Sequence, residues 1–164
     1  FFFKQKTAYE IKECDWSSDV CSSDLERSID LALVRAAAPL PGDFRPAAIA
    51  RSSSIDVGAT FRVIGFGLAQ EGRGVSGGQL RSGTIAVRAP LSSILMWAED
   101  PDRKGLGACT GDSGGPIVSS SGAVVAITSW STGTGGKKCG ALTQGAILAP
   151  HSSWIDGALR NWAK

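Results

Sequence analysis

Short apolar runs separated by glycine- and proline-rich turns dominate the chain from residue 30 onward. Runs of this length, bounded by turn residues at close intervals, are typical of an all-β barrel or sandwich. The pattern predicts strands at residues 30–35, 61–66, 80–87, 91–97, 116–119, 123–130 and 142–148. Residues 38–50 carry three prolines and are predicted to form an extended connection. Gly65 and Gly67 indicate close backbone packing at the end of the second predicted strand.

A helix is predicted at the C-terminus, because apolar residues there recur at helical spacing. These residues are Trp154, Ile155, Ala158, Leu159 and Trp162. Ser153, followed three residues later by Asp156, resembles a capping box at the helix start. We expect the apolar face of this helix to pack on the barrel.

The composition is that of one modest globular domain. The chain has 164 residues and 17.0 kDa, of which 43% are hydrophobic and 20% charged. No apolar run approaches the ~18–20 residues that a membrane span needs, and the net charge of +2 is too small to indicate a nucleic-acid partner. We therefore expect no membrane or nucleic-acid partner, no cofactor and no metal ion.

The first 25 residues differ in origin from the rest. Residues 4–11 and 15–25 resemble one reading frame of a sequencing adapter, with a variable index between them. A signal peptide would need an apolar stretch of ~7–15 residues and a small-residue cleavage site, which this segment lacks. We interpret residues 1–25 as artefactual and residues 26–164 as the natural domain. Without the segment's three lysines and five acidic residues, 14 basic and 10 acidic groups remain, a net charge of +4.

The residues with the clearest chemistry are Gly-Asp-Ser-Gly-Gly at positions 111–115. A serine hydroxyl is a poor nucleophile unless a base removes its proton, and reaction through an oxyanion needs converging backbone N–H groups. Glycines around a serine allow a tight turn that exposes the hydroxyl and aims those groups. By itself the string is also compatible with an ordinary turn.

With its flanking Cys109 and Pro116, this string resembles the nucleophile loop of the trypsin/chymotrypsin-like serine proteases. The resemblance implies that Ser113 is the nucleophile and that the Gly111 and Ser113 N–H groups form the oxyanion hole. It also implies that Asp112 pairs with a freed N-terminal amine in the active enzyme.

Further segments match the family in order. Residues 28–34 resemble the segment with the triad aspartate, which makes Asp30 the acid that orients the histidine. Residues 63–67 resemble the strand that opens the second barrel, and residues 127–131 the strand that pairs with substrate backbone. Residues 139–150, with Trp154 and Ile155, resemble the closing strand and terminal helix. The implied fold is a chymotrypsin-like double β-barrel, mostly its second barrel, with a C-terminal α-helix.

Cys109 and Cys139 stand at positions that a disulfide joins in the family. The alternative is a pair of buried thiols. A bridge implies an oxidising compartment, so we expect the protein to be secreted or periplasmic.

The sequence departs from the family pattern in its histidine. The family's catalytic histidine lies upstream of the aspartate, whereas the single histidine here, His151, lies near the C-terminus. We interpret His151 as a helix-start residue. The chain is then expected to be a truncated serine endopeptidase, inactive as written.

The resemblance also predicts the substrate pocket. Gly107 stands at the pocket floor, where trypsin-like members carry an aspartate, and this argues against specificity for basic residues. Ser131 and Gly145 align with the pocket walls, and Ser129 and Trp130 with the substrate-binding strand. These residues predict an apolar preference. Residues 131–138 form a loop longer than the common family form, which we expect at the rim of the cleft.

Two other functions fit parts of the sequence. One is a protease-like binding module without catalysis, although the presence of both Ser113 and Asp30 argues against it. The other is an esterase with a G-x-S-x-G elbow, which requires a helix after the serine and an acid downstream of it. Neither requirement is met, because residues after Pro116 are predicted strands and Asp30 is upstream. We expect a monomer that acts on protein or peptide substrates.

Overall fold

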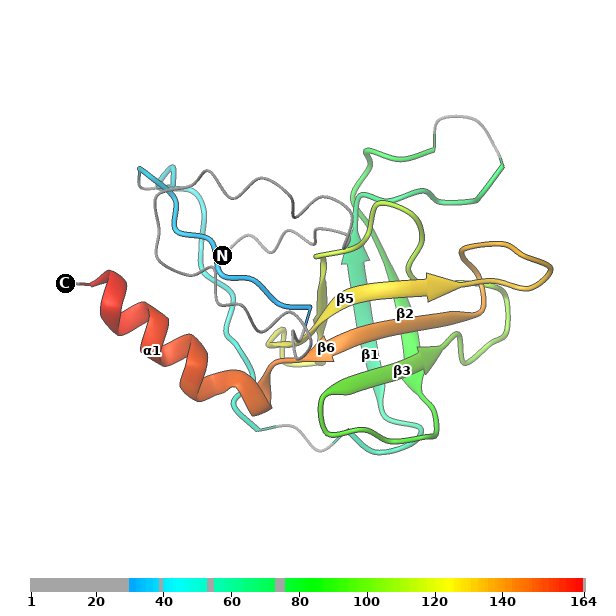
Figure 1. The fold of residues 1–164 in the computed structure, drawn as a ribbon. Helices are drawn as coiled ribbons and strands as arrows, with labels where there is room; N and C mark the ends of the chain where they lie inside the picture. Colours follow the sequence, from blue (N-terminus) through cyan, green and yellow to red (C-terminus); the bar gives the residue numbers. More distant parts are fainter. Residues whose placement is uncertain (1–29, 39, 53–54, 73–75, 164) are drawn as a thin grey trace.

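The computed structural model describes residues 30–38, 40–52, 55–72 and 76–163. Six strands form one closed barrel, and a single α-helix follows the last strand (Figure 1). The strands are β1 (Thr60–Gly65), β2 (Arg81–Val87), β3 (Leu95–Glu99), β4 (Pro116–Val118), β5 (Val124–Thr132) and β6 (Leu142–Ile147). The short 3₁₀ helix η2 (Ala149–His151) leads into α1 (Ser152–Trp162).

The barrel is antiparallel throughout, with the strands hydrogen-bonded in the order β1-β2-β3-β6-β5-β4. Every strand therefore has two neighbours, and the barrel leaves no edge strand exposed. The predicted all-β architecture with a C-terminal helix is confirmed. Six of the seven predicted strands are present, with boundaries shifted by at most four residues.

Alternating side chains of the strands fill the barrel. In β1, Phe61 and Val63 are buried while Thr60 and Arg62 are exposed, because successive side chains of a strand point to opposite faces. Each of the first three strands contributes a pair of this kind to one apolar cluster. The cluster comprises Phe61, Val63, Ile85, Val87, Met96, Ala98, Ala108, Ile117, Val125, Ala126 and Ile147.

A second apolar cluster joins the helix to the outside of the barrel. Ile155 of α1 is fully buried and packs with Leu148, Ile127, Val124 and Val118. The extended segment at residues 30–35 covers part of this cluster through half-buried Leu31 and Leu33. The N-terminal segment and the helix thus pack against the same apolar cluster.

The predicted strand at residues 30–35 is not a strand. The segment is extended, but within the described residues it forms no ladder with any neighbour. Its alternation survives as packing, since Leu31 and Leu33 face the second cluster while Ala32 and Val34 are exposed. The apolar residues of this segment indicate that it packs on the protein, but they do not reveal whether a partner strand is present.

The predicted capping box is also absent. Helix α1 begins one residue earlier, at Ser152, whose hydroxyl donates to the Ala149 carbonyl oxygen at 2.8 Å. Asp156 instead forms an ion pair with Arg51 at 2.8 Å. Trp154, expected on the packed face, is 42% exposed. Among the described residues no helix is long and apolar enough to cross a membrane.

Replacing Ile155 by Ala tests whether the helix depends on its single buried side chain. We expect a loss of about 2–5 kcal/mol in the free energy of unfolding, as for other large-to-small core substitutions. Urea denaturation followed by tryptophan fluorescence measures it. The control is Asn161→Ala in the same helix, an exposed position expected to change stability by less than ~0.5 kcal/mol. Equal effects of the two substitutions would contradict the described packing.

Candidate active site

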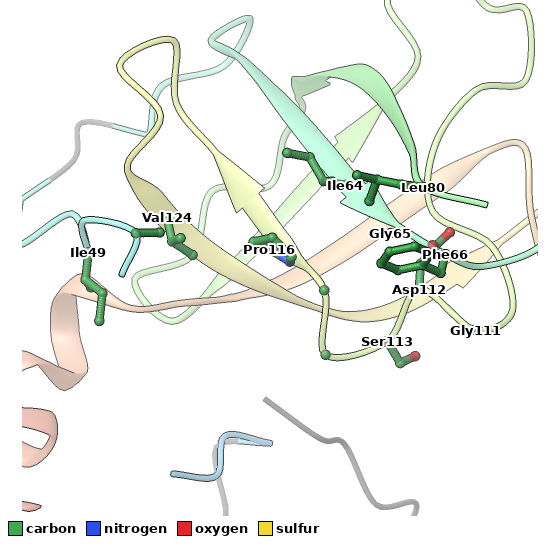
Figure 2. A pocket seen from close by; sticks show the side chains of 13 residues that line it. Ile49, Ile64, Gly65, Phe66, Leu80, Gly111, Asp112, Ser113, Pro116 and Val124 are labelled. Atoms are coloured by element: carbon green, nitrogen blue, oxygen red, sulfur yellow. The ribbon is translucent and has the colours of Figure 1, made fainter. Parts of the chain in front are cut away.

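The loop at residues 109–115 is a tight turn that presents Ser113 at its exposed tip (Figure 2). Two hydrogen bonds close the turn, from Asp112 N–H to the Cys109 carbonyl at 3.0 Å and from Gly115 N–H to the Asp112 carbonyl at 2.9 Å. Gly111 has a φ of +97°, a conformation that side chains disfavour, and this explains the glycine.

Strand β5 holds the same loop from the other side. Gly114 N–H donates to the Thr128 carbonyl at 2.8 Å, and Thr128 N–H donates to the Gly115 carbonyl at 2.9 Å. Meanwhile the N–H groups of Gly111 and Ser113 donate to no acceptor among the described residues. Two backbone donors beside an exposed hydroxyl are therefore available to a ligand oxygen.

The Asp112 carboxylate lies behind the turn, with each oxygen paired to a backbone N–H. Oδ1 accepts from Gly67 at 2.8 Å and Oδ2 from Cys109 at 2.8 Å. The close packing predicted from Gly65 and Gly67 is present, because a Cβ on Gly67 would lie 2.5 Å from the Asp112 carboxyl carbon. The family resemblance implied an amine partner for Asp112. In this structure two backbone N–H groups of the chain donate to the carboxylate.

Ser129 connects the tip of the loop with Asp30. The Ser113 hydroxyl donates to the Ser129 carbonyl oxygen at 3.4 Å, and the Ser129 hydroxyl donates to Asp30 Oδ2 at 2.6 Å. The pairing of β5 with β6 shifts register between Thr128 and Trp130. Ser129 is therefore the extra residue of a bulge, a feature that re-aims a side chain. The geometry brings Ser113, Ser129 and Asp30 together at one place.

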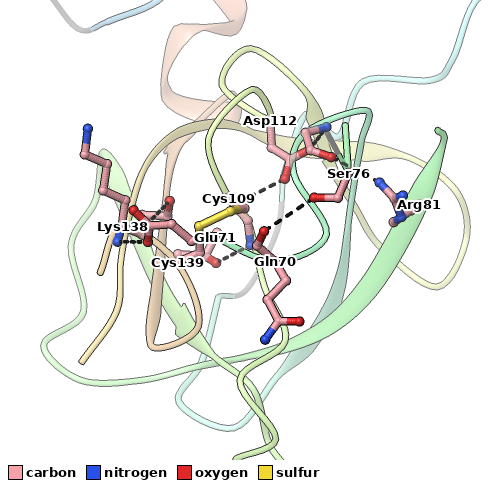
Figure 3. Close-up of a disulfide and its surroundings, with 12 residues drawn as sticks. Gln70, Glu71, Ser76, Arg81, Cys109, Asp112, Lys138 and Cys139 are labelled. Atoms are coloured by element: carbon pink, nitrogen blue, oxygen red, sulfur yellow. Dashed lines mark hydrogen bonds between the residues drawn. A yellow bond between two sulfur atoms is a disulfide. The ribbon is translucent and has the colours of Figure 1, made fainter. Parts of the chain in front are cut away.

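The predicted disulfide between Cys109 and Cys139 is present and ties the nucleophile loop to the loop at residues 131–138 (Figure 3). A second contact holds that loop in place: Lys138 N–H donates to Glu71 Oε2 at 2.6 Å. Ser131, expected at a pocket wall, donates its hydroxyl to the Lys138 carbonyl at 2.8 Å. The Ser131 side chain is thus hydrogen-bonded to the other end of the loop at residues 131–138.

Thr143 lies beside the predicted pocket floor. A Cβ on Gly107 would lie 2.8 Å from Thr143 Oγ1, which accepts the Ala108 N–H at 3.0 Å. Gly145 is buried and faces Ile117 and the barrel interior. Thr143 and Gly145 are both buried and lie on the same face of β6, because successive side chains of a strand alternate. No motif in the sequence pointed to Thr143, and the assignment of Gly145 to a pocket wall stays a prediction.

An apolar pocket of about 510 Å³ opens beside Ser113, which is one of its lining residues (Figure 2). Phe66 and Leu80 line it and are more than half exposed. Ile49, Ile64 and Pro116 continue the apolar surface. Trp130, assigned to the substrate-binding strand, is 49% exposed and stands edge-on to Trp97, with ring centroids 6.3 Å apart.

Asp100 organises the loop that leads to Gly107. It is 5% exposed and accepts backbone N–H bonds from Leu106 at 3.0 Å, Lys104 at 2.7 Å and Asp102 at 2.9 Å. The Leu106 bond, helped by the other two and by the Lys104 charge, outweighs burial and lowers the pKa of Asp100 below its ordinary 3.8. No pattern of residue types indicates this role, which depends on three backbone N–H groups that converge on one carboxylate.

His151 does not belong to this arrangement. As expected, it stands at the helix start, where its backbone N–H donates to the Leu148 carbonyl oxygen at 2.9 Å. Its Nε2 is buried without a partner among the described residues, and burial lowers the pKa of the imidazole. No hydrogen bond within the described chain links it to Ser113. The same residues contain no cluster of histidine, cysteine or acidic side chains suited to a metal ion.

Ser113 is exposed beside two backbone N–H groups that have no acceptor among the described residues, at the rim of an antiparallel barrel, and this arrangement is found in serine proteases. A family model described as Trypsin matches residues 4–155. That match covers most of the sequence, and the chain belongs to the trypsin family.

Two solved structures are similar to this chain in fold. Mouse neuropsin, described as a serine protease expressed in the limbic system of mouse brain, matches with a TM-score of 0.61 and 21% identity, over 74% of this chain and 57% of its own. A mutant of human heparin-binding protein (CAP37) matches with a TM-score of 0.63 and 26% identity, over 80% and 56%. The chain thus spans a little over half the length of these structures. No curated protein matches the sequence.

Replacing Asp100 by Asn tests the role of its charge through pH. A carboxylate whose pKa is lowered in the fold stabilises it above the ordinary pKa and loses that contribution as pH falls through the folded value. We expect Asp100→Asn to lower the urea midpoint at pH 7 and to converge with the parent chain toward pH 3. The control Asp43→Asn, at an exposed residue, should leave the midpoint unchanged at both pH values. Parallel pH profiles for the parent and Asp100→Asn would refute the role.

Replacing Gly107 by Ala tests the packing of the pocket floor. Its φ of +147° and the 2.8 Å approach to Thr143 both oppose a side chain, and we expect a loss of about 1–3 kcal/mol in the free energy of unfolding. Gly42→Ala is the control, because a Cβ there meets no atom within 4 Å. Thermal and urea denaturation measure both variants. A Gly107→Ala chain as stable as Gly42→Ala would contradict the described floor.

Proposed function

We propose that this chain is the nucleophile-bearing part of a serine endopeptidase that works through an acyl-enzyme, and that it is inactive as written. The observation that carries the proposal is the position of Ser113. Its hydroxyl is exposed beside the Gly111 and Ser113 N–H groups, which have no acceptor in the part of the chain that the structure describes, and Ser129 links it to Asp30.

In the proposed mechanism, Ser113 Oγ attacks the carbonyl carbon of the scissile peptide bond as a base accepts its proton. The negative oxygen of the tetrahedral intermediate is held by the N–H groups of Gly111 and Ser113. The peptide bond breaks when the protonated base returns its proton to the leaving amine, and water then releases the acyl group by the same steps. Asp30 orients the base and stabilises its protonated form.

The missing part is the base. The Ser113 hydroxyl donates to a backbone carbonyl, which cannot take up its proton. His151 stands at the helix start, burial lowers the pKa of its imidazole, and among the described residues no hydrogen bond joins it to the loop. We therefore assign the base to a histidine supplied by the longer parent protein. The exposed apolar pocket beside Ser113 supports this assignment, since Phe66 and Leu80 would be covered there by the rest of the protease.

The pocket floor supports an apolar substrate preference. Gly107 supplies no charge for a basic side chain, and the one atom of the described residues within 4 Å of a Cβ placed there is the neutral Thr143 Oγ1. Thr143 narrows the floor beneath Gly107. The proposed substrates are proteins or peptides with an apolar residue before the scissile bond.

The disulfide supports secretion or export to a periplasm, because such bonds persist in oxidising compartments. We expect the parent to be a monomer without cofactors. The interpretation of residues 1–25 as adapter-derived falls outside the described residues and stays a prediction.

The purified chain should hydrolyse no peptide at an enzymatic rate, because Ser113 lacks a base. Incubation with apolar peptide substrates and a serine-directed phosphonate measures turnover and labelling. Oxyanion stabilisation alone could leave a residual effect of about 10³-fold over water. Attaching an upstream histidine-bearing segment should restore turnover, and Ser113→Ala should then abolish it.

Two results would overturn the proposal. Turnover by the chain as written, with stoichiometric labelling of Ser113, would assign the base to a residue of this chain. Recovery of an upstream gene segment in which the histidine is replaced would make the parent a binding module.

A further inference from the structure

The Ser129 hydroxyl has one proton and faces two side-chain oxygens. Its Oγ lies 2.6 Å from Asp30 Oδ2 and 3.3 Å from Gln144 Oε1. A hydroxyl carries one O–H donor and two lone pairs, whereas a carboxylate only accepts. The 2.6 Å distance is that of a charge-assisted O–H···O bond, so the proton belongs to Asp30. An oxygen of Gln144 that faces the same hydroxyl then meets a lone pair rather than a proton.

Turning over the side-chain amide of Gln144 removes this conflict. The oxygen and nitrogen of an amide are nearly equal in shape, and the surrounding hydrogen bonds decide which of them faces a neighbour. With Nε2 toward Ser129, the amide donates an N–H to a lone pair of the hydroxyl oxygen. Gln144 has no other side-chain hydrogen bond among the described residues, so this orientation breaks none. The donors then run in series from Gln144 through Ser129 to Asp30.

The sheet places Gln144 where this bond can form. Strands β3, β6 and β5 are neighbours in the barrel (Figure 1), and Gln144 stands in register with Trp97 on one side and Trp130 on the other. Directly opposed residues present their side chains on the same face of a sheet. Thr143 and Gly145, which flank Gln144 in β6, are buried, so the row with Gln144 lies on the outer face of the barrel.

The two tryptophans restrict the glutamine that stands between them. The rings of Trp97 and Trp130 meet edge to face with their centroids 6.3 Å apart, although β6 lies between their strands. Gln144 is half-buried there. A side chain flanked by two large rings has fewer rotamers to lose, so ordering its amide costs less entropy. The bulge at Ser129, next to Trp130, supplies the hydroxyl that this amide meets.

We propose that Gln144 is a positioning residue for Asp30: its side-chain amide donates an N–H to the Ser129 hydroxyl oxygen and thereby leaves the hydroxyl proton for the Asp30 carboxylate. A hydroxyl that accepts one hydrogen bond donates a stronger one, because bonds in series polarise each other. The Ser129 carbonyl also accepts the Ser113 hydroxyl, so fixing Ser129 affects both residues. The inference rests on the proposed function only in making Asp30 the acid that orients the base.

NMR of the full chain labelled with ¹⁵N-glutamine tests the direction of this bond without requiring catalysis. We expect the side-chain amide protons of Gln144 to exchange at least about fivefold slower than those of Gln79, the protection that one net hydrogen bond gives. Gln79 is the matched control, since its Oε1 accepts from Arg81 and its side-chain nitrogen has no acceptor among the described residues. Ser129→Ala should remove the protection at Gln144 and leave Gln79 unchanged.

A substitution of Gln144 then separates a donor from an acceptor. Gln144→Met is similar in length but can neither donate an N–H nor compete as an amide oxygen. The carboxyl ¹³C resonance of Asp30 reports the bond that it accepts from Ser129. We expect Gln144→Met to move this resonance toward its position in Ser129→Ala, because the hydroxyl donates more weakly without the N–H. Gln79→Met, the same change at the control residue, should leave the resonance in place.

Each of three results would contradict the proposal. One is exchange of the Gln144 side-chain protons as fast as that of Gln79. Another is protection that persists in Ser129→Ala, which would give the amide a different acceptor. The third is a Gln144→Met shift in the opposite direction, which would mean that the amide competes with Asp30 for the Ser129 proton. If Gln144→Met does not fold, the exchange comparison with Ser129→Ala still decides.

A failure of the proposed function is distinguishable from a failure of this inference. It would be seen as turnover by the chain as written, which concerns the base. The exchange rates of Gln144 and the Asp30 resonance would be unaffected.

Discussion

The pairing of the Asp112 carboxylate with two backbone N–H groups determines where Ser113 stands. A carboxylate drawn away from water costs several kcal/mol unless it is hydrogen-bonded, and here each oxygen has a donor, Gly67 or Cys109. Since Asp112 and Ser113 are adjacent, fixing one side chain inward directs the next outward. The same contact explains why positions 65 and 67 are glycines, because a Cβ at either would overlap the carboxyl group.

The barrel supplies the two surfaces between which this carboxylate is held. The end of β1 provides Gly67, and the loop before β4 provides Cys109, which the disulfide joins to Cys139. Strand β5 then fixes the far side of the turn through Thr128 and, at the following bulge, turns Ser129 toward Asp30. The site is therefore assembled from four segments. Three of them adjoin strands of the closed barrel, and the fourth, which carries Asp30, packs on it through Leu31 and Leu33. The helix contributes indirectly, because its Ile155 belongs to the same apolar cluster.

Sequence reasoning located the strands and the nucleophile loop but missed details that depend on partners. The apolar run at residues 30–35 predicted a strand, but among the described residues the segment forms no ladder and packs instead through Leu31 and Leu33. The Ser153–Asp156 spacing fits a capping box, but Arg51, which is remote in the sequence, pairs with the carboxylate. Gly145, aligned with a pocket wall, lies buried next to Ile117, and its role at the pocket stays a prediction. Asp100, whose three partners are all backbone groups, left no mark in the pattern of residue types.

The sequence by itself determined the all-β fold class and the exposed serine turn, because these follow from local properties: strand periodicity, glycine conformations and a short motif. The pairing of Cys109 with Cys139 was implied only by the resemblance to trypsin-like proteases, and the structure contains it. The tertiary structure alone decided which atoms meet. That Asp112 is satisfied by amides, that Thr143 contacts the floor at Gly107, and that the Ser129 hydroxyl meets both Asp30 and Gln144 all depend on distances of about 3 Å between segments that are remote in the chain. Hydrogen bonds weaken steeply with small errors in distance and angle, so contacts of this kind become defined only when the barrel has closed and its register is set.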